Sequence, residues 1–184
     1  MNPDELLAFL KSRRVAREFT GEPVSDEMLA QIAEAARWAT SGGNQHLHKL
    51  LIVRDPALIQ RVRTISPGML SQPPVLIVIL TDRQRAIEKG AQIDHDHINY
   101  VDVGTAAMNM AVQVHALGLG SCPVTSFSQS GAAEMLDLPT HLTPEFILMV
   151  GHPDRRPKTR TANAPRPISA HELTYWDRAG NLEP

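Results

Sequence analysis

The sequence has little of several features that define common protein classes. It contains one cysteine, Cys122, so no disulfide can form within the chain, as is typical of proteins of a reducing cytosol. No stretch of about 18 apolar residues is free of charged or amide side chains, which argues against a membrane span. The N-terminus, Met1–Glu5, lacks the cationic start and apolar run of a signal peptide. We therefore expect a cytoplasmic protein.

The sequence also lacks a large charge of either sign. Its net charge is −2 over 184 residues, which offers no general attraction to nucleic acid. The cations are nevertheless clustered. One cluster is Arg13, Arg14 and Arg17, and the other comprises Arg155, Arg156, Lys158, Arg160 and Arg166. Each cluster is either a local anion site or an ordinary solvated basic surface.

No protein-borne catalytic group stands out, so the catalytic residues stay unassigned. Ser121 and Cys122 have no neighbouring base and fit a packing role. The Ser41–Asn44 turn lacks the Gly-Lys-Ser/Thr ending of a nucleotide phosphate loop, and no dinucleotide fingerprint occurs. His95 and His97 have no third ligand nearby in sequence, so we expect no metal. The chemistry therefore belongs to a cofactor.

Apolar runs predict the strands. Residues 50–53, 75–80 and 146–150 are continuously apolar, and residues 121–124 add a short edge strand, where a proline is tolerated. Runs without alternation are typical of strands covered on both faces. We therefore expect helices on each side of one sheet.

Periodic apolar residues predict the helices. Residues 3–12 form a short helix, and a second helix is capped by Ser25 and ends at Gly42. Residues 57–64 and 129–136 are candidates for further short helices. These elements leave no linker, so residues 1–184 are expected to form a single domain.

The longest predicted helix, residues 98–117, is apolar on nearly all sides. It would span about 30 Å, the width of a small domain. A partner subunit would bury it, so we expect a homodimer; the alternative is a central helix inside a compact monomer. The tail, residues 152–184, is rich in proline and cations. We expect an extended C-terminal arm whose apolar end wraps the neighbouring subunit.

Three segments are candidates for ligand contact, each with a simpler alternative. Arginine forks such as Arg13 and Arg17 match phosphate oxygens, or else they are cations that favour a helix C-terminus. The Ser41–Asn44 turn is a helix cap, unless the Asn44 amide donates to and accepts from a flavin. Residues 124–126 offer free backbone N–H groups to a ring nitrogen, or simply connect a helix to a strand.

Taken in order, these segments resemble the nitroreductase family, the FMN-dependent NAD(P)H oxidoreductases. The matching segments are Arg13–Phe19, Pro23–Val24, Ala35–Asn44, Asp102–Met110, Gly118–Cys122 and Gly151–Pro153. The resemblance implies an α+β fold: an α/β/α sandwich whose central, mostly antiparallel sheet is flanked by helices. It also implies an intertwined homodimer with two FMN molecules at the subunit interface.

The resemblance also implies a cofactor site. Arg13, Arg14, Arg17 and the tail's Arg166 would hold the FMN phosphate and nearby ring atoms. Thr40, Ser41, Gly42 and Asn44 would come from the other subunit. Pro123, Val124, Thr125 and Ser126 would lie under the ring, with a backbone N–H near Thr125 directed at flavin N5. Hydride would pass from NAD(P)H to N5 and then to a nitroaromatic, quinone or similar acceptor by ping-pong kinetics.

The chain departs from the family pattern near the cofactor. Val15 stands where serine is frequent, Thr40 where proline is frequent, and Ala164 where a tail lysine is frequent. His46-Leu47-His48 replaces a frequent Gln-Pro-Trp, so His46 is a candidate cofactor contact and the acceptor stays open. Alternatives are a specialised enzyme of the same fold (a dehydrogenase, a dehalogenase or a flavin-modifying enzyme) and a non-catalytic flavin-binding protein.

Overall fold

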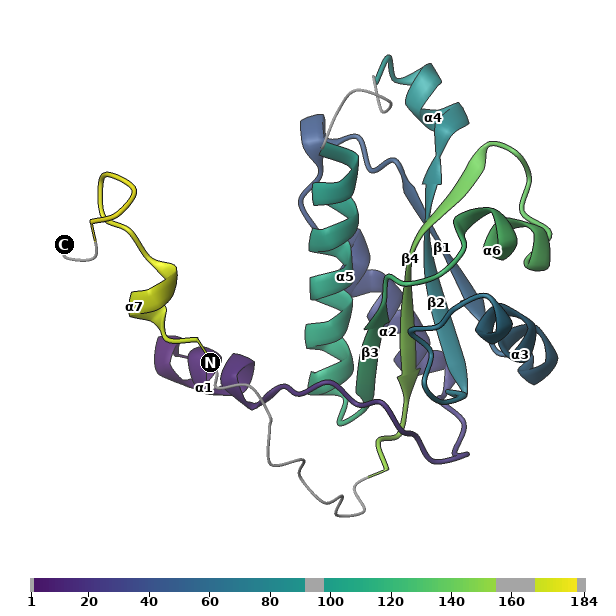
Figure 1. Ribbon diagram of the computed structural model, residues 1–184, viewed down its shortest axis with the longest axis horizontal. Coiled ribbons are helices and arrows are strands. Elements are labelled where there is room, and N and C mark those ends of the chain that lie inside the picture. The colour runs from purple at the N-terminus through teal and green to yellow at the C-terminus, as the bar shows by residue number, and fades with distance from the viewer. Residues whose placement is uncertain (1, 92–97, 155–167, 182–184) are drawn as a thin grey trace. The chain divides into compact units, whose positions relative to one another are not determined.

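The computed structural model describes residues 2–91, 98–154 and 168–181. The chain divides into two compact units, residues 1–154 and 155–184. The first unit is an α+β sandwich in which helices cover both faces of one sheet (Figure 1). The predicted fold class is therefore confirmed.

All four predicted strands are present. They are β1 (His48–Val53), β2 (Val75–Asp82), β3 (Gly120–Val124) and β4 (Leu142–Gly151). Their order in the sheet is β1-β2-β4-β3, and every neighbouring pair is antiparallel. The strands are longer than the apolar runs because polar residues extend three of them. β3 is an edge strand, as its proline indicated.

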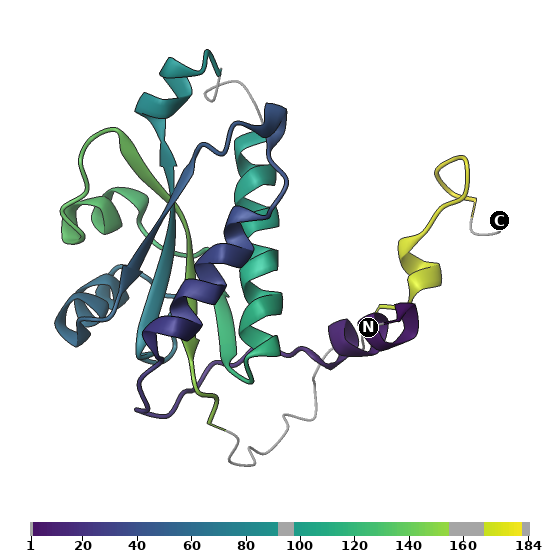
Figure 2. The same ribbon diagram turned by 180° about the vertical axis from the view of Figure 1, so that it is seen from behind.

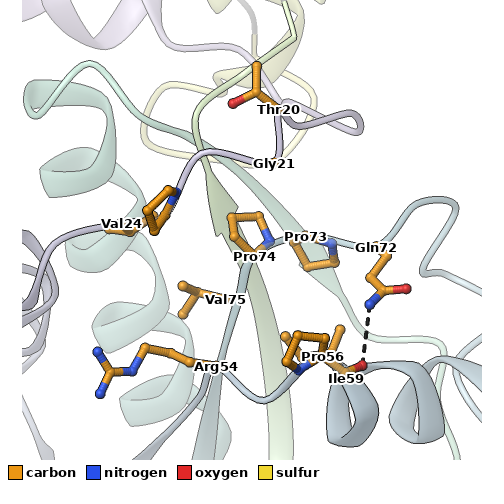
Figure 3. A pocket seen from close by; sticks show the side chains of 11 residues that line it. Thr20, Gly21, Val24, Arg54, Pro56, Ile59, Gln72, Pro73, Pro74 and Val75 are labelled. Atoms are coloured by element: carbon orange, nitrogen blue, oxygen red, sulfur yellow. Dashed lines mark hydrogen bonds between the residues drawn. The ribbon is translucent and has the colours of Figure 1, made fainter.

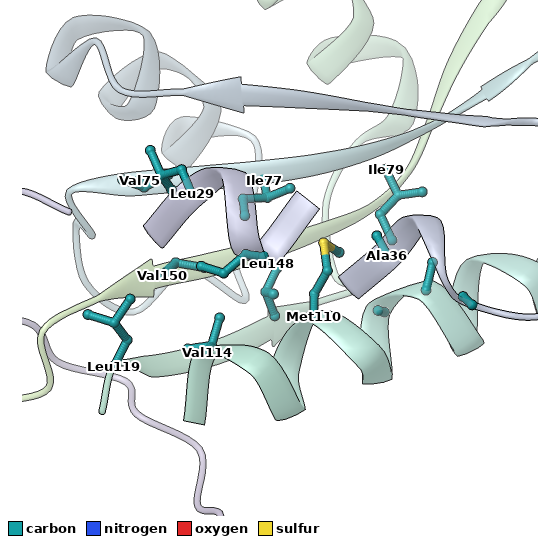
Figure 4. Packing of buried hydrophobic residues seen from close by; sticks show 14 of the residues in the cluster. Leu29, Ala36, Val75, Ile77, Ile79, Met110, Val114, Leu119, Leu148 and Val150 are labelled. Carbon is teal, nitrogen blue, oxygen red and sulfur yellow. The ribbon is translucent and has the colours of Figure 1, made fainter. Parts of the chain in front are cut away.

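Side chains of the central strand β2 alternate between two cores, and all its residues are buried. Val75, Ile77 and Ile79 join the core beneath α2 (Asp26–Arg37) and α5 (Ile98–Ala116), together with β4 residues (Figure 4). Figure 2 shows α2 lying along α5 on this face. Helices are therefore needed here because this face is wholly apolar.

The opposite face of the sheet carries the second core. Leu76, Val78 and Leu80 pack there with Ile59 and Val62 of α3 (Pro56–Thr64). The short helix α6 (Gln129–Met135) contacts both β4 and α3. Burial of β2 on both faces explains its unbroken apolar sequence.

Helix α1 (Pro3–Ser12) has the predicted bounds, and a capping box between Asn2 and Glu5 starts it. None of its residues is buried. It meets the C-terminal end of α5, where Ser12 Oγ lies 2.7 Å from His115 Nε2. This contact places the end of α1, and therefore the start of the Arg13–Arg17 segment, beside the last turn of α5.

The end of the second helix was predicted wrongly. Helix α2 stops at Arg37, well before Gly42, with Trp38 as its C-cap. Residues of α5 hold the following backbone away from a helical path, since Thr105 Oγ1 donates to the Thr40 carbonyl at 3.1 Å. Gly42–Asn44 then forms one separate 3-10 turn, η1. The short helix α4 (Arg83–Glu88) was not predicted.

Helix α5 is covered by its own chain on one side only. Val103, Ala106 and Met110 are buried in the first core. On the outward side, Tyr100 is 65% exposed, Val101 61% and Met108 47%. An apolar face of this kind agrees with the predicted partner subunit, which stays a prediction.

The first residues of the C-terminal region, 152–154, are paired with the main body of the fold. His152–Asp154 pair with the chain after the arginines, since Thr20 N donates to the His152 carbonyl at 2.8 Å. In the second unit, residues 168–181 contain a short helix, α7 (Ala170–Leu173), capped by Ser169. A capping box stabilises this turn, so the tail is not extended throughout. Arg166 and the cation cluster at 155–160 lie outside the described residues.

Candidate functional site

The arginine-rich segment lies along the outer edge of β3. Val15 forms a parallel bridge with Ser121, and Ala16 N donates to the Ser121 carbonyl at 2.9 Å. A Cβ atom at Gly120 would lie 2.5 Å from the Ala16 Cβ, far inside van der Waals contact. Glycine at position 120 therefore lets the basic segment approach the strand.

The three arginines play different parts. Arg14 donates to the Arg13 carbonyl at 2.9 Å and to the Lys11 carbonyl, both at the C-terminal end of α1. The guanidinium groups of Arg13 and Arg17 have no hydrogen bond or ion pair with any described residue. Arg14 is thus engaged as a helix-capping cation, whereas Arg13 and Arg17 remain available to an anion; the cofactor contacts expected of all three stay predictions.

The end of β3 continues this surface. Pro123, Thr125 and Ser126 are exposed, while the Val124 side chain is buried beneath them. Gly68 N donates to the Ser126 carbonyl at 3.3 Å and steadies the turn. Within residues 2–91 and 98–154, the Thr125 backbone N–H has no hydrogen-bond partner, as predicted. We call Arg13–Arg17 and Pro123–Ser126 together the β3-edge half-site.

Two neighbours of this half-site have structural roles. Ser71 Oγ donates to the Arg17 carbonyl, a contact that nothing in the local sequence indicated. Cys122 is buried, and burial raises the pKa of its thiol although the Arg17 charge opposes the shift. A thiol in this setting is not an activated nucleophile, in keeping with the packing role expected for it.

The second predicted segment, residues 40–46, lies against the start of α5. Gly42 N donates to both carboxylate oxygens of Asp102, at 3.0 and 3.1 Å. Asp102 is buried and was not predicted as a site residue. Its signal was in the sequence: it is the only carboxylate in α5, and a buried carboxylate needs a donor. We call Thr40–His46 the α5-start half-site.

This half-site is held by internal hydrogen bonds. Gly43, Asn44 and His46 have positive φ values of 56°, 55° and 49°. His46 N donates to Ser41 Oγ at 3.1 Å, and His46 Nε2 lies 2.8 Å from Asn44 Oδ1. The Asn44 oxygen is therefore already engaged, so its amide nitrogen is the group left to meet a ligand.

His48 begins β1 just behind this turn. Its Nδ1 is buried and has no hydrogen-bond partner among the described residues. Burial, with a smaller contribution from His46, lowers the pKa of His48, and the Asp102 charge opposes the shift. His48 is thereby favoured in its neutral form.

One chain does not bring the two half-sites together. The α5-start half-site contacts Asp102 and Thr105, whereas Arg13, at the basic end of the β3-edge half-site, directly follows Ser12, which lies beside His115. These contacts are about 15–20 Å apart along the helix axis. β1 and β3 are also the opposite edges of the sheet, separated by about 14 Å. Residues that were predicted to share one ligand thus occupy two places.

A separate cavity of about 420 Å³ lies at the end of the sheet where β2 begins, between the Thr20–Val24 segment, the start of α3 and the start of β2 (Figure 3). Prolines form much of its wall, and Gln72 Nε2 donates to the Pro56 carbonyl at 3.3 Å. Arg54 is its single ionisable lining residue and is ion-paired with Asp26. None of the predicted site residues lines this cavity.

The described residues hold no group of three histidine, cysteine or acidic side chains placed to bind a metal. His95 and His97 lie outside those residues. In the part of the chain that the structure describes, no helix is both long and apolar enough to cross a membrane.

Comparison with known proteins places these half-sites in context. The Nitroreductase family profile matches residues 10–67 and 63–152, which include both half-sites. The FMN reductase [NAD(P)H] of Bacillus subtilis is 27% identical over 190 residues, spanning 95% of this chain and 76% of that protein. The NADPH-flavin oxidoreductase of Vibrio harveyi is 26% identical, spanning 90% of this chain and 72% of that protein.

Solved structures agree in fold. NfrA1 of B. megaterium superimposes with a TM-score of 0.80 at 20% identity, covering 95% of this chain and 74% of that one. A nitroreductase family protein of Clostridium difficile gives a TM-score of 0.77 at 22% identity, covering 97% of this chain and 99% of that one. The family match spans most of the sequence, and the resemblance seen in the sequence is confirmed: the chain belongs to the nitroreductase family.

Proposed function

We propose that the chain is an FMN-dependent oxidoreductase that takes hydride from NADH or NADPH and passes electrons to a quinone, nitroaromatic or similar acceptor. The family and the names of its relatives support an NAD(P)H-dependent flavin oxidoreductase. The observation that carries the proposal is the β3-edge half-site, where two guanidinium groups and a backbone N–H lie close together without partners among the described residues.

The basic segment fits the phosphate of FMN. Arg13 and Arg17 each lie two residues from Val15, which bridges to β3, and side chains four positions apart in an extended segment leave it on the same side. Each guanidinium can donate two parallel hydrogen bonds to phosphate oxygens. Arg14 contributes indirectly, because it fixes the turn from which Arg13 projects.

The end of β3 fits the planar ring. Pro123 and Ser126 present an exposed platform, and the free N–H of Thr125 is a donor that a flavin ring nitrogen can accept. Bound FMN supplies hydride transfer, which no side chain of the site can perform. The protein's part is to bind the phosphate, orient the ring and direct one backbone donor at it.

The α5-start half-site completes the pocket from a second copy of the chain. The separation of the half-sites supports this arrangement, since both cannot contact the same end of one cofactor in one chain. The outward face of α5 lies between them, and its exposed Tyr100, Val101 and Met108 would be buried between the two copies. We therefore propose a homodimer with two equivalent sites.

Purified protein tests this function directly. It should be yellow, and anaerobic NADH or NADPH should bleach the flavin absorption; a quinone such as menadione should then restore it. Parallel double-reciprocal plots would support the ping-pong sequence. Yellow protein that neither nucleotide bleaches would leave a flavin-binding protein without this activity, and protein that takes up no FMN would refute the proposal.

A further inference from the structure

The His46 imidazole is held in one orientation within the α5-start half-site. Its Nε2 lies 2.8 Å from Asn44 Oδ1, and its backbone N donates to Ser41 Oγ at 3.1 Å. Of the four non-glycine residues with positive φ in the described ranges, two are Asn44 and His46. Positive φ is uncommon for non-glycine residues, although asparagine and histidine adopt it more readily than most, so the hydrogen bonds around the turn decide whether it is kept.

The surroundings of this turn are unusually restrictive. Asp102 of α5 accepts from Gly42 N, and Asp82 N at the end of β2 donates to the Leu47 carbonyl at 2.8 Å. From α4, Arg85 Nε donates to the Gln45 carbonyl at 3.4 Å. Three elements therefore hold the turn on both sides of His46.

The hydrogen bond to Asn44 decides which ring nitrogen can exchange a proton. A carbonyl oxygen only accepts, so the bonded Nε2 of His46 carries a hydrogen. The other nitrogen, Nδ1, makes no hydrogen bond to any described residue. It is therefore the ring nitrogen left to exchange a proton with a ligand.

The charged and titratable groups around the turn leave this role to His46. Among the described residues they are His48 from β1, Asp82 from the end of β2, Asp102 from α5 and Arg85 from α4, and the Asp82 carboxylate accepts from Arg85 N at 3.0 Å. His48 is favoured as neutral by burial, and both Asp102 oxygens accept from Gly42 N. The Arg85 guanidinium is directed at the Gln45 carbonyl. His46, half-buried and in reach of solvent, is the proton donor of the group.

We propose that His46 is a catalytic acid that donates its Nδ1 proton to a quinone acceptor, while Asn44 positions the ring. This inference rests on the proposed function. Hydride from the cofactor, reduced by NAD(P)H, bonds to one quinone oxygen and supplies two electrons. The displaced electron pair passes through the ring to the second oxygen, which forms its O–H bond with the Nδ1 proton. Neutral His46 then takes a proton from water.

The oxidative half-reaction isolates this step. FMN-loaded enzyme is reduced anaerobically and mixed with menadione in a stopped-flow instrument, from about pH 5.5 to about pH 8.5, across the ordinary imidazole range. The wild-type rate should fall as the pH rises. His46→Gln should react about 100-fold more slowly at the acidic end and lose the pH dependence. His141→Gln, at a half-buried histidine on the α6–β4 connection, is the matched control and should keep the wild-type profile.

A second readout does not depend on turnover. In protein labelled with ¹⁵N-histidine, the neutral His46 ring should carry its proton on Nε2 alone, and Asn44→Leu should return the ring to the mixture of the two tautomers that free histidine shows. A wild-type rate and pH profile in His46→Gln would overturn the acid role, and a neutral ring protonated on Nδ1 would overturn the positioning. Failure of NAD(P)H to reduce bound FMN would instead refute the proposed function. That outcome is seen before menadione is added, so the two failures are distinguishable.

Discussion

The two half-sites are built in opposite ways. In the β3-edge half-site, the guanidinium groups of Arg13 and Arg17 and the Thr125 N–H have no partners among the described residues. In the α5-start half-site, nearly every polar group has one, from the Gly42 N–H on Asp102 to the Asn44 oxygen near His46. The first is completed by a ligand. The second is complete without one and offers a fixed surface.

This difference indicates which kinds of change each half-site tolerates. Open cations tolerate movement, because the ligand phosphate draws them into place. A turn with left-handed backbone tolerates little, because its hydrogen bonds hold the conformation. Changes in the first half-site should therefore act on affinity, and changes in the second on stability and geometry.

The largest effect is expected where the two half-sites would be joined. Met108→Glu places a carboxylate on the outward face of α5, and burying it unpaired in an interface costs about 3–5 kcal/mol. Dimer association should weaken by more than about 100-fold, and FMN should be lost with it. Light scattering and flavin titration measure both quantities.

Ile87→Glu is the matched control for this change. Ile87 is 80% exposed on α4, so its replacement should leave both the dimer and the flavin content intact. A dimeric Met108→Glu protein that retains FMN would show that α5 does not join the half-sites.

The next largest effect is a loss of FMN affinity, and it should differ between Arg13 and Arg14. Arg13→Ala should weaken FMN binding by about 1.5–3 kcal/mol, the scale of a hydrogen bond to a charged group. Arg14→Ala should weaken it less and act chiefly on the end of α1, where Arg14 donates to the Lys11 and Arg13 carbonyls. Fluorescence titration with FMN gives the two affinities. Equal losses would contradict the distinction between the free and the capping arginine.

In the α5-start half-site, a change of similar size is expected in the free energy of unfolding. Asp102→Ala removes both acceptors of the Gly42 N–H, and a hydrogen bond to a charged group is worth about 1.5–3 kcal/mol. Denaturant unfolding of the FMN-free protein measures this directly. Asp4→Ala on the exposed α1 serves as control, since no residue of that helix is buried. An unchanged midpoint for Asp102→Ala would mean that the turn does not depend on α5.

The smallest effect is a pH dependence of stability. The folded-state pKa of His48 lies below its ordinary value of 6.5, chiefly because of burial. As the pH falls below about 6.5, the unfolded chain takes up the proton first, so stability decreases toward the folded pKa. Solvent screening limits the effect to under about 1 kcal/mol.

His48→Phe should remove this acid sensitivity while leaving the stability above pH 6.5 nearly unchanged. Unfolding midpoints measured across that range provide the comparison, with His141→Phe as the control. A slope in His48→Phe equal to that of the wild type would assign the acid sensitivity to other groups.

Much of the fold follows from the sequence because its core is so uniformly apolar. The runs at 75–80 and 146–150 predict strands, since β2 and β4 are central and covered on both faces. Their polar ends, such as Thr81 and Asp82, were missed because burial there depends on partners in α5 and α4. The end of α2 was missed for a similar reason: Thr105 and Asp102, far along the chain, hold residues 40–42.

The local features of the candidate site follow from the sequence more readily than their arrangement does, and the role of these residues in binding a cofactor stays a prediction. The arginine cluster and the free N–H near residue 125 are local features, and both are where the sequence indicated. Local sequence does not reveal that Arg14 is engaged by α1, or that the Asn44 oxygen is engaged by His46. The distance between the half-sites depends on the sheet order and the length of α5, which are properties of the whole fold.

The pairing of Val15 with Ser121 has a consequence for solubility. β3 is an edge strand, and an uncovered edge can pair with strands of other molecules. The Arg13–Arg17 segment covers part of that edge, and Pro123 removes a donor from the remainder. The residues that we propose to bind the cofactor thus also protect the sheet edge from pairing with other molecules. Selection for solubility therefore acts on the same segment as selection for binding.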